Sequence, residues 1–190
     1  PSNWGLGKGE PETGVTLHAM TPKPDDGDIV GQARIPIEWD DTALRLTPKA
    51  ADAGKKLVSE VVPELVKGTA RRVSQRTLGP SSYFGGRKPS DSRLDFAMPV
   101  REAFNQIRAV ADPWPNAFLE TERGTLKVAW AVPASASCPP GQFRPEREGV
   151  VLGFADGALT IKALRRGEVR SEAAADHAAW LASLGLPAYS

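Results

Sequence analysis

The chain is poor in cysteine, in histidine and in long hydrophobic runs. Among its 190 residues there are one cysteine and two histidines. A single thiol excludes an internal disulfide framework and a cysteine-based zinc site, and two imidazoles argue against a histidine-rich metal centre. No apolar run is long enough for a transmembrane helix, and the chain does not open with the basic and apolar segments of a secretory leader. We therefore expect a cytoplasmic protein with no membrane contact and no bound metal.

The chain also lacks a charge excess of either sign. Lysine and arginine total 24 against 23 acidic residues, which gives a formal net charge of +1 and no global attraction to nucleic acid or membrane. Hydrophobic residues make up 41% of the chain, which is enough for a globular protein to bury a core. A length of 190 residues allows one domain or two small ones.

The first half predicts a strand hairpin between loop-like segments. Residues 1–13 hold three glycines and two prolines, which are typical of a loop. Residues 14–20 are β-branched and apolar, and residues 29–37 alternate, so both predict strands. Between them, residues 21–28 combine two prolines with Gly27 and three aspartates, a composition that predicts an acidic turn.

A helix and a basic connection come next along the chain. The helix is expected after Thr42 and is expected to stop at Gly68, and Pro48 is a favourable residue for the start of its main part. Residues 67–88 contain six cations and no acid, with many glycines, serines and prolines. We interpret this segment as a basic connection between two domains.

The second half predicts a helix and two hairpins. Apolar residues recur at helical spacing after Pro99. Residues 117–132 predict a hairpin that turns at Arg123-Gly124, and residues 150–164 predict another around Asp156-Gly157. A last Ala-rich helix is expected between a Ser171 cap and Gly185. Short strands with a flanking helix suggest a small barrel, so the fold class is α/β plus β.

The acidic turn is the first candidate site. Asp25, Asp26 and Asp28 could bind a divalent cation, or one of them could orient and charge a catalytic imidazole. From spacing alone, a solvated turn whose side chains bond their own backbone is the more common outcome. His18 lies within a predicted strand, where a lone histidine is more often structural than catalytic.

The basic segment is the second candidate. Its cations could contact phosphates, and Tyr83 and Phe84 could stack on a base, although a solvated linker is the commoner case. His177, on the Ala-rich helix, is expected to be solvated. Cys138 has no visible base partner that would make it a nucleophile.

Five segments, in the right order, resemble one family. They are Pro1-Ser2-Asn3-Trp4, the stretch GEPETGVTLH from Gly9 to His18, the DDGDI loop from Asp25 to Ile29, Phe84 to Pro89, and Arg108 to Phe118. Together they resemble the 10-formyltetrahydrofolate-dependent formyltransferases, the group that holds methionyl-tRNA formyltransferase and the enzyme that formylates UDP-4-amino-4-deoxy-L-arabinose.

The resemblance implies a fold and a chemistry. Residues 1–88 would be the C-terminal part of a Rossmann-like catalytic domain with its basic linker, and residues 89–190 an OB-fold-like barrel. A formyl group would pass from 10-formyltetrahydrofolate to a primary amine at a site of Asn, His and Asp. By motif position the Asp is Asp25, and the folate-contacting loop comprises Thr21, Pro22, Lys23, Pro24 and Asp25.

The resemblance also implies what these 190 residues lack. The family's N-x-H-x-S-L-L-P motif, with the catalytic Asn and His, would lie just upstream of residue 1, so we expect the chain alone to be inactive. The linker sequence from Phe84 to Pro89 is more similar to that of the amino-sugar enzyme. This similarity favours a small-molecule amine acceptor, such as an amino-sugar nucleotide or an amino-acid-derived precursor, over the alternative, methionyl-tRNA. A non-catalytic module that binds nucleic acid or a protein partner is a second alternative. No pattern indicates an oligomeric state.

Overall fold

The computed structural model describes residues 2–79 and 82–189 and divides into two compact units. The C-terminal unit comprises Pro1–Gly9, Thr42–Leu44 and Gly86–Ser190. The hairpin unit comprises Glu10–Asp41 and Arg45–Gly85. The predicted domain boundary between residues 88 and 89 stays a prediction.

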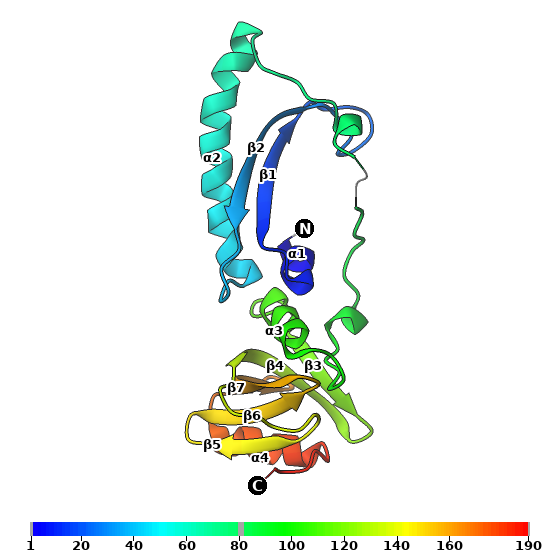
Figure 1. Ribbon diagram of the computed structural model, residues 1–190, viewed down its shortest axis with the longest axis vertical. Helices are drawn as coiled ribbons and strands as arrows, with labels where there is room; N and C mark the ends of the chain where they lie inside the picture. Colours follow the sequence, from blue (N-terminus) through cyan, green and yellow to red (C-terminus); the bar gives the residue numbers. More distant parts are fainter. Residues whose placement is uncertain (1, 80–81, 190) are drawn as a thin grey trace. The chain divides into compact units, whose positions relative to one another are not determined.

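The hairpin unit contains two strands and a long helix (Figure 1). Strands β1 (Glu12–His18) and β2 (Ile29–Pro36) pair antiparallel, which confirms the predicted strands and the turn between them. Helix α2 (Ala43–Lys67) packs on β2 so closely that a Cβ on Gly31 would lie 2.9 Å from Val61 and 3.0 Å from Leu57. Glycine at this position therefore lets the helix approach the hairpin.

Helix α2 does not begin at Pro48, as the sequence suggested, but includes it. A proline inside a helix removes one backbone hydrogen bond and strains the preceding turn. Leu46 in that turn is fully buried, so tertiary packing outweighs the local preference here. The helix ends before Gly68, whose φ of +72° belongs to the left-handed region that glycine favours at a helix end.

The basic segment between the units carries little regular structure in its described residues. A short 3₁₀ helix, η1 (Gln75–Thr77), and a bridge between Val73 and Ile29 are its main features. The two amides of that bridge donate to the two carbonyls at 2.8 and 2.9 Å. The segment is thus fixed to the start of β2 at one point.

The C-terminal unit is built on a six-stranded antiparallel sheet (Figure 1). Its strand order is β3-β4-β7-β6-β5, and β8 pairs with β7. The bounds are β3 (Ala117–Thr121), β4 (Gly124–Pro133), β5 (Phe143–Glu146), β6 (Gly149–Phe154), β7 (Gly157–Arg166) and β8 (Val169–Ser171). Helices α3 (Val100–Ala109) and α4 (Ala174–Ser183) and the 3₁₀ helix η2 (Pro89–Ser92) complete the unit.

The core of this unit joins α3, α4 and the sheet. Phe104 and Ile107 of α3 and Leu181 of α4 belong to one buried cluster with the strands. All six residues of β6 are buried. The predicted amphipathic helix after Pro99 is confirmed, because its apolar stripe faces this cluster.

The predicted loop at the chain's start is wrong, because Ser2–Lys8 forms helix α1. Helix α1 packs against α3, with Leu6 fully buried and the Asn3 side-chain amide donating to the Ala109 carbonyl at 2.7 Å. These tertiary contacts compensate for the poor helix propensity of its glycines. Gly9, at φ +73°, comes directly after the helix end.

Two turn predictions are off by one residue. Thr121 pairs with Gly124 and Phe154 with Gly157, so the two-residue loops are Glu122-Arg123 and Ala155-Asp156. The glycine of each predicted turn instead opens the next strand. Strands β5 and β8 were not predicted, since both are short and β8 is largely exposed.

The start of α4 and the setting of His177 also differ from the prediction. Ser171 ends β8 rather than capping the helix directly, although its hydroxyl accepts from the Ala173 amide and donates to Asp176. His177 is fully buried instead of solvated, and its Nε2 donates to the Ser171 carbonyl at 2.9 Å. The packing of α4 on the sheet explains this burial.

The fold is mixed α/β with antiparallel sheets. The Rossmann-like and OB-fold-like assignments, which the resemblance implies, stay predictions. Across the described ranges, no helix combines the length and hydrophobicity that crossing a membrane requires.

Candidate functional site

The loop between β1 and β2 is tightly closed at its base. The Ala19 amide donates to the Asp28 carbonyl at 2.9 Å, just after β1 and just before β2. A Cβ on Gly27 would lie 1.7 Å from the Ala19 carbonyl oxygen, so only glycine fits this turn. Gly27 therefore determines the loop conformation, as the turn prediction required.

A glutamine from the basic segment holds the same loop. The side-chain amide of Gln75 donates to the carbonyl oxygens of Asp25 at 2.9 Å and of Gly27 at 2.6 Å. Sequence reasoning missed this residue, because a lone glutamine 48 positions from Gly27 carries no pattern. Its neighbour Val73 pairs with Ile29, which explains how Gln75 reaches the loop.

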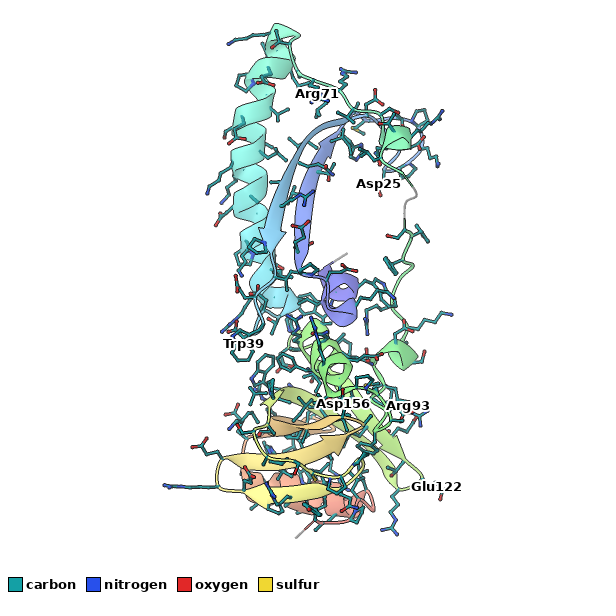
Figure 2. The ribbon with its side chains drawn as sticks, in the orientation of Figure 1. Asp25, Trp39, Arg71, Arg93, Glu122 and Asp156 are labelled. Carbon is teal, nitrogen blue, oxygen red and sulfur yellow. The ribbon has the colours of Figure 1, made fainter. Side chains whose placement is uncertain are left out.

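Asp25 projects from the loop into solvent. Its φ of +56° lies in the left-handed region, which aspartate tolerates better than most residues. Its side chain is 97% exposed. Figure 2 shows Asp25 and Arg71 at the same end of the β1–β2 hairpin. An exposed carboxylate on a fixed backbone can accept a hydrogen bond from a group outside the loop.

The structure brings His18 to Asp25, although the sequence pattern predicted only a structural role for the histidine. Its Nε2 lies 3.6 Å from the Asp25 carboxylate, and its Nδ1 lies 3.0 Å from the Ala19 carbonyl oxygen. Because a carbonyl oxygen only accepts, Nδ1 carries the proton in the neutral ring and Nε2 faces the carboxylate as a lone pair. The pair therefore attracts only when the ring carries both protons.

The other residues of the predicted folate-contacting loop form a short exposed turn. The Thr21 hydroxyl donates to the Lys23 carbonyl at 2.8 Å, and the Lys23 ammonium lies 3.5 Å from the Asp26 carboxylate. Met20 is 95% exposed, an unusual setting for an apolar side chain. Pro22 and Pro24 keep the turn stiff. Together, Thr21–Asp25 present apolar surface, one cation and one carboxylate.

The divalent-cation alternative for the acidic loop finds no support in the geometry. In the described part of the chain, no three His, Cys, Asp or Glu side chains gather where they could hold a metal ion. Asp26 is paired with Lys23, while Asp28 supplies its carbonyl to the closure of the loop.

The remaining candidate residues lie apart from this loop. Tyr83 of the basic segment is 92% exposed. In the other unit, Cys138 is buried and its thiol lies 3.2 Å from the Gln142 carbonyl. Burial raises the pKa of Cys138, against the opposing effects of the Gly153 amide and Arg144, which leaves the thiol protonated and unreactive. His177 is tied to the Ser171 carbonyl within the C-terminal unit.

Comparison with protein families gives two matches that run along the chain in order. Residues 1–62 match the family model described as formyl transferase. Residues 87–180 match the model described as formyl transferase, C-terminal domain. The loop with Asp25 falls in the first match and the six-stranded sheet in the second.

Similar folds occur among solved structures. HypX from Aquifex aeolicus, in complex with tetrahydrofolic acid, is 20% identical with a TM-score of 0.69, covering 100% of this chain and 34% of that one. An N-formyltransferase from Helicobacter canadensis, in complex with folinic acid and dTDP-3-aminofucose, is 24% identical with a TM-score of 0.68. The match covers 84% of this chain and 58% of that one. Methionyl-tRNA formyltransferase from Clostridium thermocellum is 19% identical with a TM-score of 0.55, and the match covers 72% of this chain and 58% of that one. The chain thus spans 34% to 58% of the length of these proteins.

Proposed function

Because the chain belongs to the formyl transferase family, we propose that it supplies the Asp25 loop and the C-terminal domain of an enzyme that formylates a primary amine. The formyl donor is 10-formyltetrahydrofolate. The observation that carries the proposal is the exposed Asp25 carboxylate, held on a closed loop by Gly27 and Gln75 within the segment that matches the family.

The loop fits a folate donor in its surface chemistry. Met20 offers exposed apolar surface to a planar ring system, and Lys23 offers a cation to carboxylates. The turn from Thr21 to Asp25 would lie along the bound folate donor. When bound, the donor supplies the formyl carbon that the amine nitrogen attacks. The chain's own task is to hold that turn rigid and to present one carboxylate beside it.

Asp25 would act on an imidazole. A carboxylate beside a histidine favours the protonated ring and fixes its orientation, so that the ring can take and return a proton. The resemblance implies an imidazole from the N-x-H-x-S-L-L-P motif. In this chain, His18 Nε2 lies 3.6 Å from the Asp25 carboxylate and can attract it when the His18 ring carries both protons. We therefore assign Asp25 the catalytic role and His18 a positioning role.

The acceptor is proposed to be a small-molecule amine, such as an amino-sugar nucleotide or an amino-acid-derived precursor. The net charge of +1 gives no strong pull toward a large RNA. Similar folds include both an enzyme with a bound amino-sugar nucleotide and a methionyl-tRNA formyltransferase. Methionyl-tRNA is accordingly the second candidate, favoured by the cations of residues 67–88.

The acceptor assay uses the protein that joins this chain to the N-x-H-x-S-L-L-P motif. That protein, 10-formyltetrahydrofolate and a panel of amino-sugar nucleotides are incubated, and formylated amine is detected by mass. Turnover of an amino-sugar nucleotide with no formylation of methionyl-tRNA supports the proposal. Tight, strongly salt-sensitive binding and formylation of methionyl-tRNA would reverse the choice of acceptor.

A second assay uses the polypeptide of residues 1–190 alone. It contains Asp25 but no N-x-H-x-S-L-L-P motif, so we expect no catalytic turnover with any of these amines. Turnover by this polypeptide would show that its own groups, with His18 foremost, carry the reaction. The coding sequence upstream adds a simple check. An in-frame motif there supports the enzyme, whereas a start codon at residue 1 supports a non-catalytic binding module.

A further inference from the structure

A separate cavity of about 450 Å³ lies wholly within the C-terminal unit. Helix α1, the segment around η2, the α3–β3 connection and β4 all contribute to its lining. Its volume falls in the range of about 300–1,000 Å³ that is typical of small-molecule sites. None of its lining residues belongs to the Asp25 loop, so a ligand in this cavity is independent of the proposed formyl transfer.

The lining of this cavity is one-sided in charge. It includes the cations Arg87, Lys88 and Lys127 and no acidic side chain. Neither lysine forms an ion pair within residues 2–79 and 82–189. Asp91 and Asp112, on adjacent segments, are engaged elsewhere, by the Lys88 backbone amide and by two arginines. A lining with three cations and no acidic side chain of its own favours an anionic ligand.

Arg87 is held rigidly at the wall of the cavity. Its guanidinium lies 4.8 Å from the Trp4 ring centre and donates to the Asp91 carbonyl. Its Nε–H is buried and has no hydrogen-bond partner in the described part of the chain. Burial lowers the pKa of Arg87, and Asp91 opposes that effect, but arginine stays charged under ordinary conditions. A cation that is already fixed in position is preorganised for an anionic ligand.

The rest of the lining suits a flat ring. Trp114 and Phe118 contribute aromatic surface, and Pro89, Pro115 and Val110 contribute apolar surface. Asn3 and Thr125 add polar groups at the same cavity. Aromatic and proline surfaces stack on planar rings, while a small number of polar groups fixes orientation.

We propose that this cavity binds a small ligand that combines a planar ring with an anionic group. The ring lies against Trp114 and Phe118, and the anionic group meets Lys127, Lys88 and Arg87. Two sources share this chemistry, a nucleoside phosphate and an aromatic carboxylate. Neither the ring nor the anion alone satisfies the site.

Calorimetric titration of the 190-residue chain at low ionic strength tests the proposal. The probes are adenosine monophosphate, 4-aminobenzoate, adenosine and inorganic phosphate. We expect one of the first two to bind at a single site with a dissociation constant below about 1 mM, and adenosine and phosphate to bind at least about tenfold more weakly. The better of the first two probes identifies the source.

Matched variants locate the binding. Lys127→Gln keeps most of the aliphatic stem and removes the charge. It should raise the dissociation constant of the better-binding probe about five- to tenfold. Lys162→Gln, on the paired strand β7 but outside the cavity, should change this dissociation constant less than about twofold. Thr125→Asp, on the exposed rim, should also weaken binding. Absence of saturable binding by both ring anions, or equal effects of the two lysine variants, would overturn the proposal.

Discussion

The two units bury their apolar side chains to different degrees. In the C-terminal unit, β6 is buried along its whole length and joins one continuous core with α3 and α4. In the hairpin unit, α2 buries Leu57 and Val61 against β2, but Val62 is 44% and Val66 82% exposed. The difference places most of the hydrophobic stabilisation in the C-terminal unit and the candidate chemistry in the less buried one.

The largest expected effect is in the core of the C-terminal unit. Ile161→Ala, at a fully buried residue of β7, should lower the free energy of unfolding by about 2–5 kcal/mol because it removes packed methylenes and leaves a cavity. Urea unfolding monitored by tryptophan fluorescence measures the loss. Val62→Ala on α2 is the control and should cost less than about 1 kcal/mol, since this side chain is half exposed. Equal losses would contradict the difference in burial between the two units.

Gly31→Ala should cause a smaller loss, confined to the hairpin unit. The added methyl would meet Val61 at 2.9 Å and Leu57 at 3.0 Å, so these two buried side chains would have to shift. We expect about 1–3 kcal/mol. Hydrogen exchange should speed up in β1, β2 and α2 while the six-stranded sheet stays protected. Gly54→Ala is the matched control, since its Cβ would meet Val15 only at an ordinary 3.7 Å.

Much of this organisation can be predicted from the sequence, and the failures have physical causes. The alternation from Ile29 to Pro36 and the helical spacing after Val100 predicted β2 and α3, because in both cases one face is buried. Helix α1 could not be predicted, since its stability comes from Leu6 and Asn3 contacting α3 about a hundred residues away. Buried His177 was missed for the same reason.

The candidate site divides in the same way. The acidic turn and Asp25 could be identified from the sequence, because their motif lies within a few consecutive residues. Gln75 could not, because its role depends on the bridge between Val73 and Ile29. His18 is visible in the sequence as a lone strand histidine, but only the loop conformation after it brings its ring to Asp25.

Gln75→Ala should loosen the Asp25 loop without unfolding either unit. Two carbonyl oxygens lose their donor, and in this half-buried setting the cost is about 1 kcal/mol. Amide exchange over residues 19–28 should rise about fivefold. Gln32→Ala removes a comparable exposed side-chain bond, to Thr16 on the neighbouring strand, and should leave the loop unchanged. Unchanged amide exchange over residues 19–28 in Gln75→Ala would show that Gln75 does not hold the loop.

The smallest effect concerns Cys138. Burial raises its pKa in the folded chain, so the protonated thiol is favoured and the associated stability is present below the ordinary cysteine pKa. That contribution is lost as pH rises through the folded value. Iodoacetamide should therefore modify Cys138 more slowly in the folded chain than in urea, with a small loss of stability above about pH 8.5. Equal modification rates would show that the thiol is accessible.

The most decisive test of the proposed role of Asp25 compares two neighbouring carboxylates. In the protein that joins this chain to the N-x-H-x-S-L-L-P motif, the kcat for formyl transfer is measured for Asp25→Asn and Asp26→Asn. We expect a fall of about a hundredfold or more for Asp25→Asn, with unchanged circular dichroism, and less than about threefold for Asp26→Asn, whose partner is Lys23. A kcat for Asp25→Asn within about threefold of the parent would contradict the assignment.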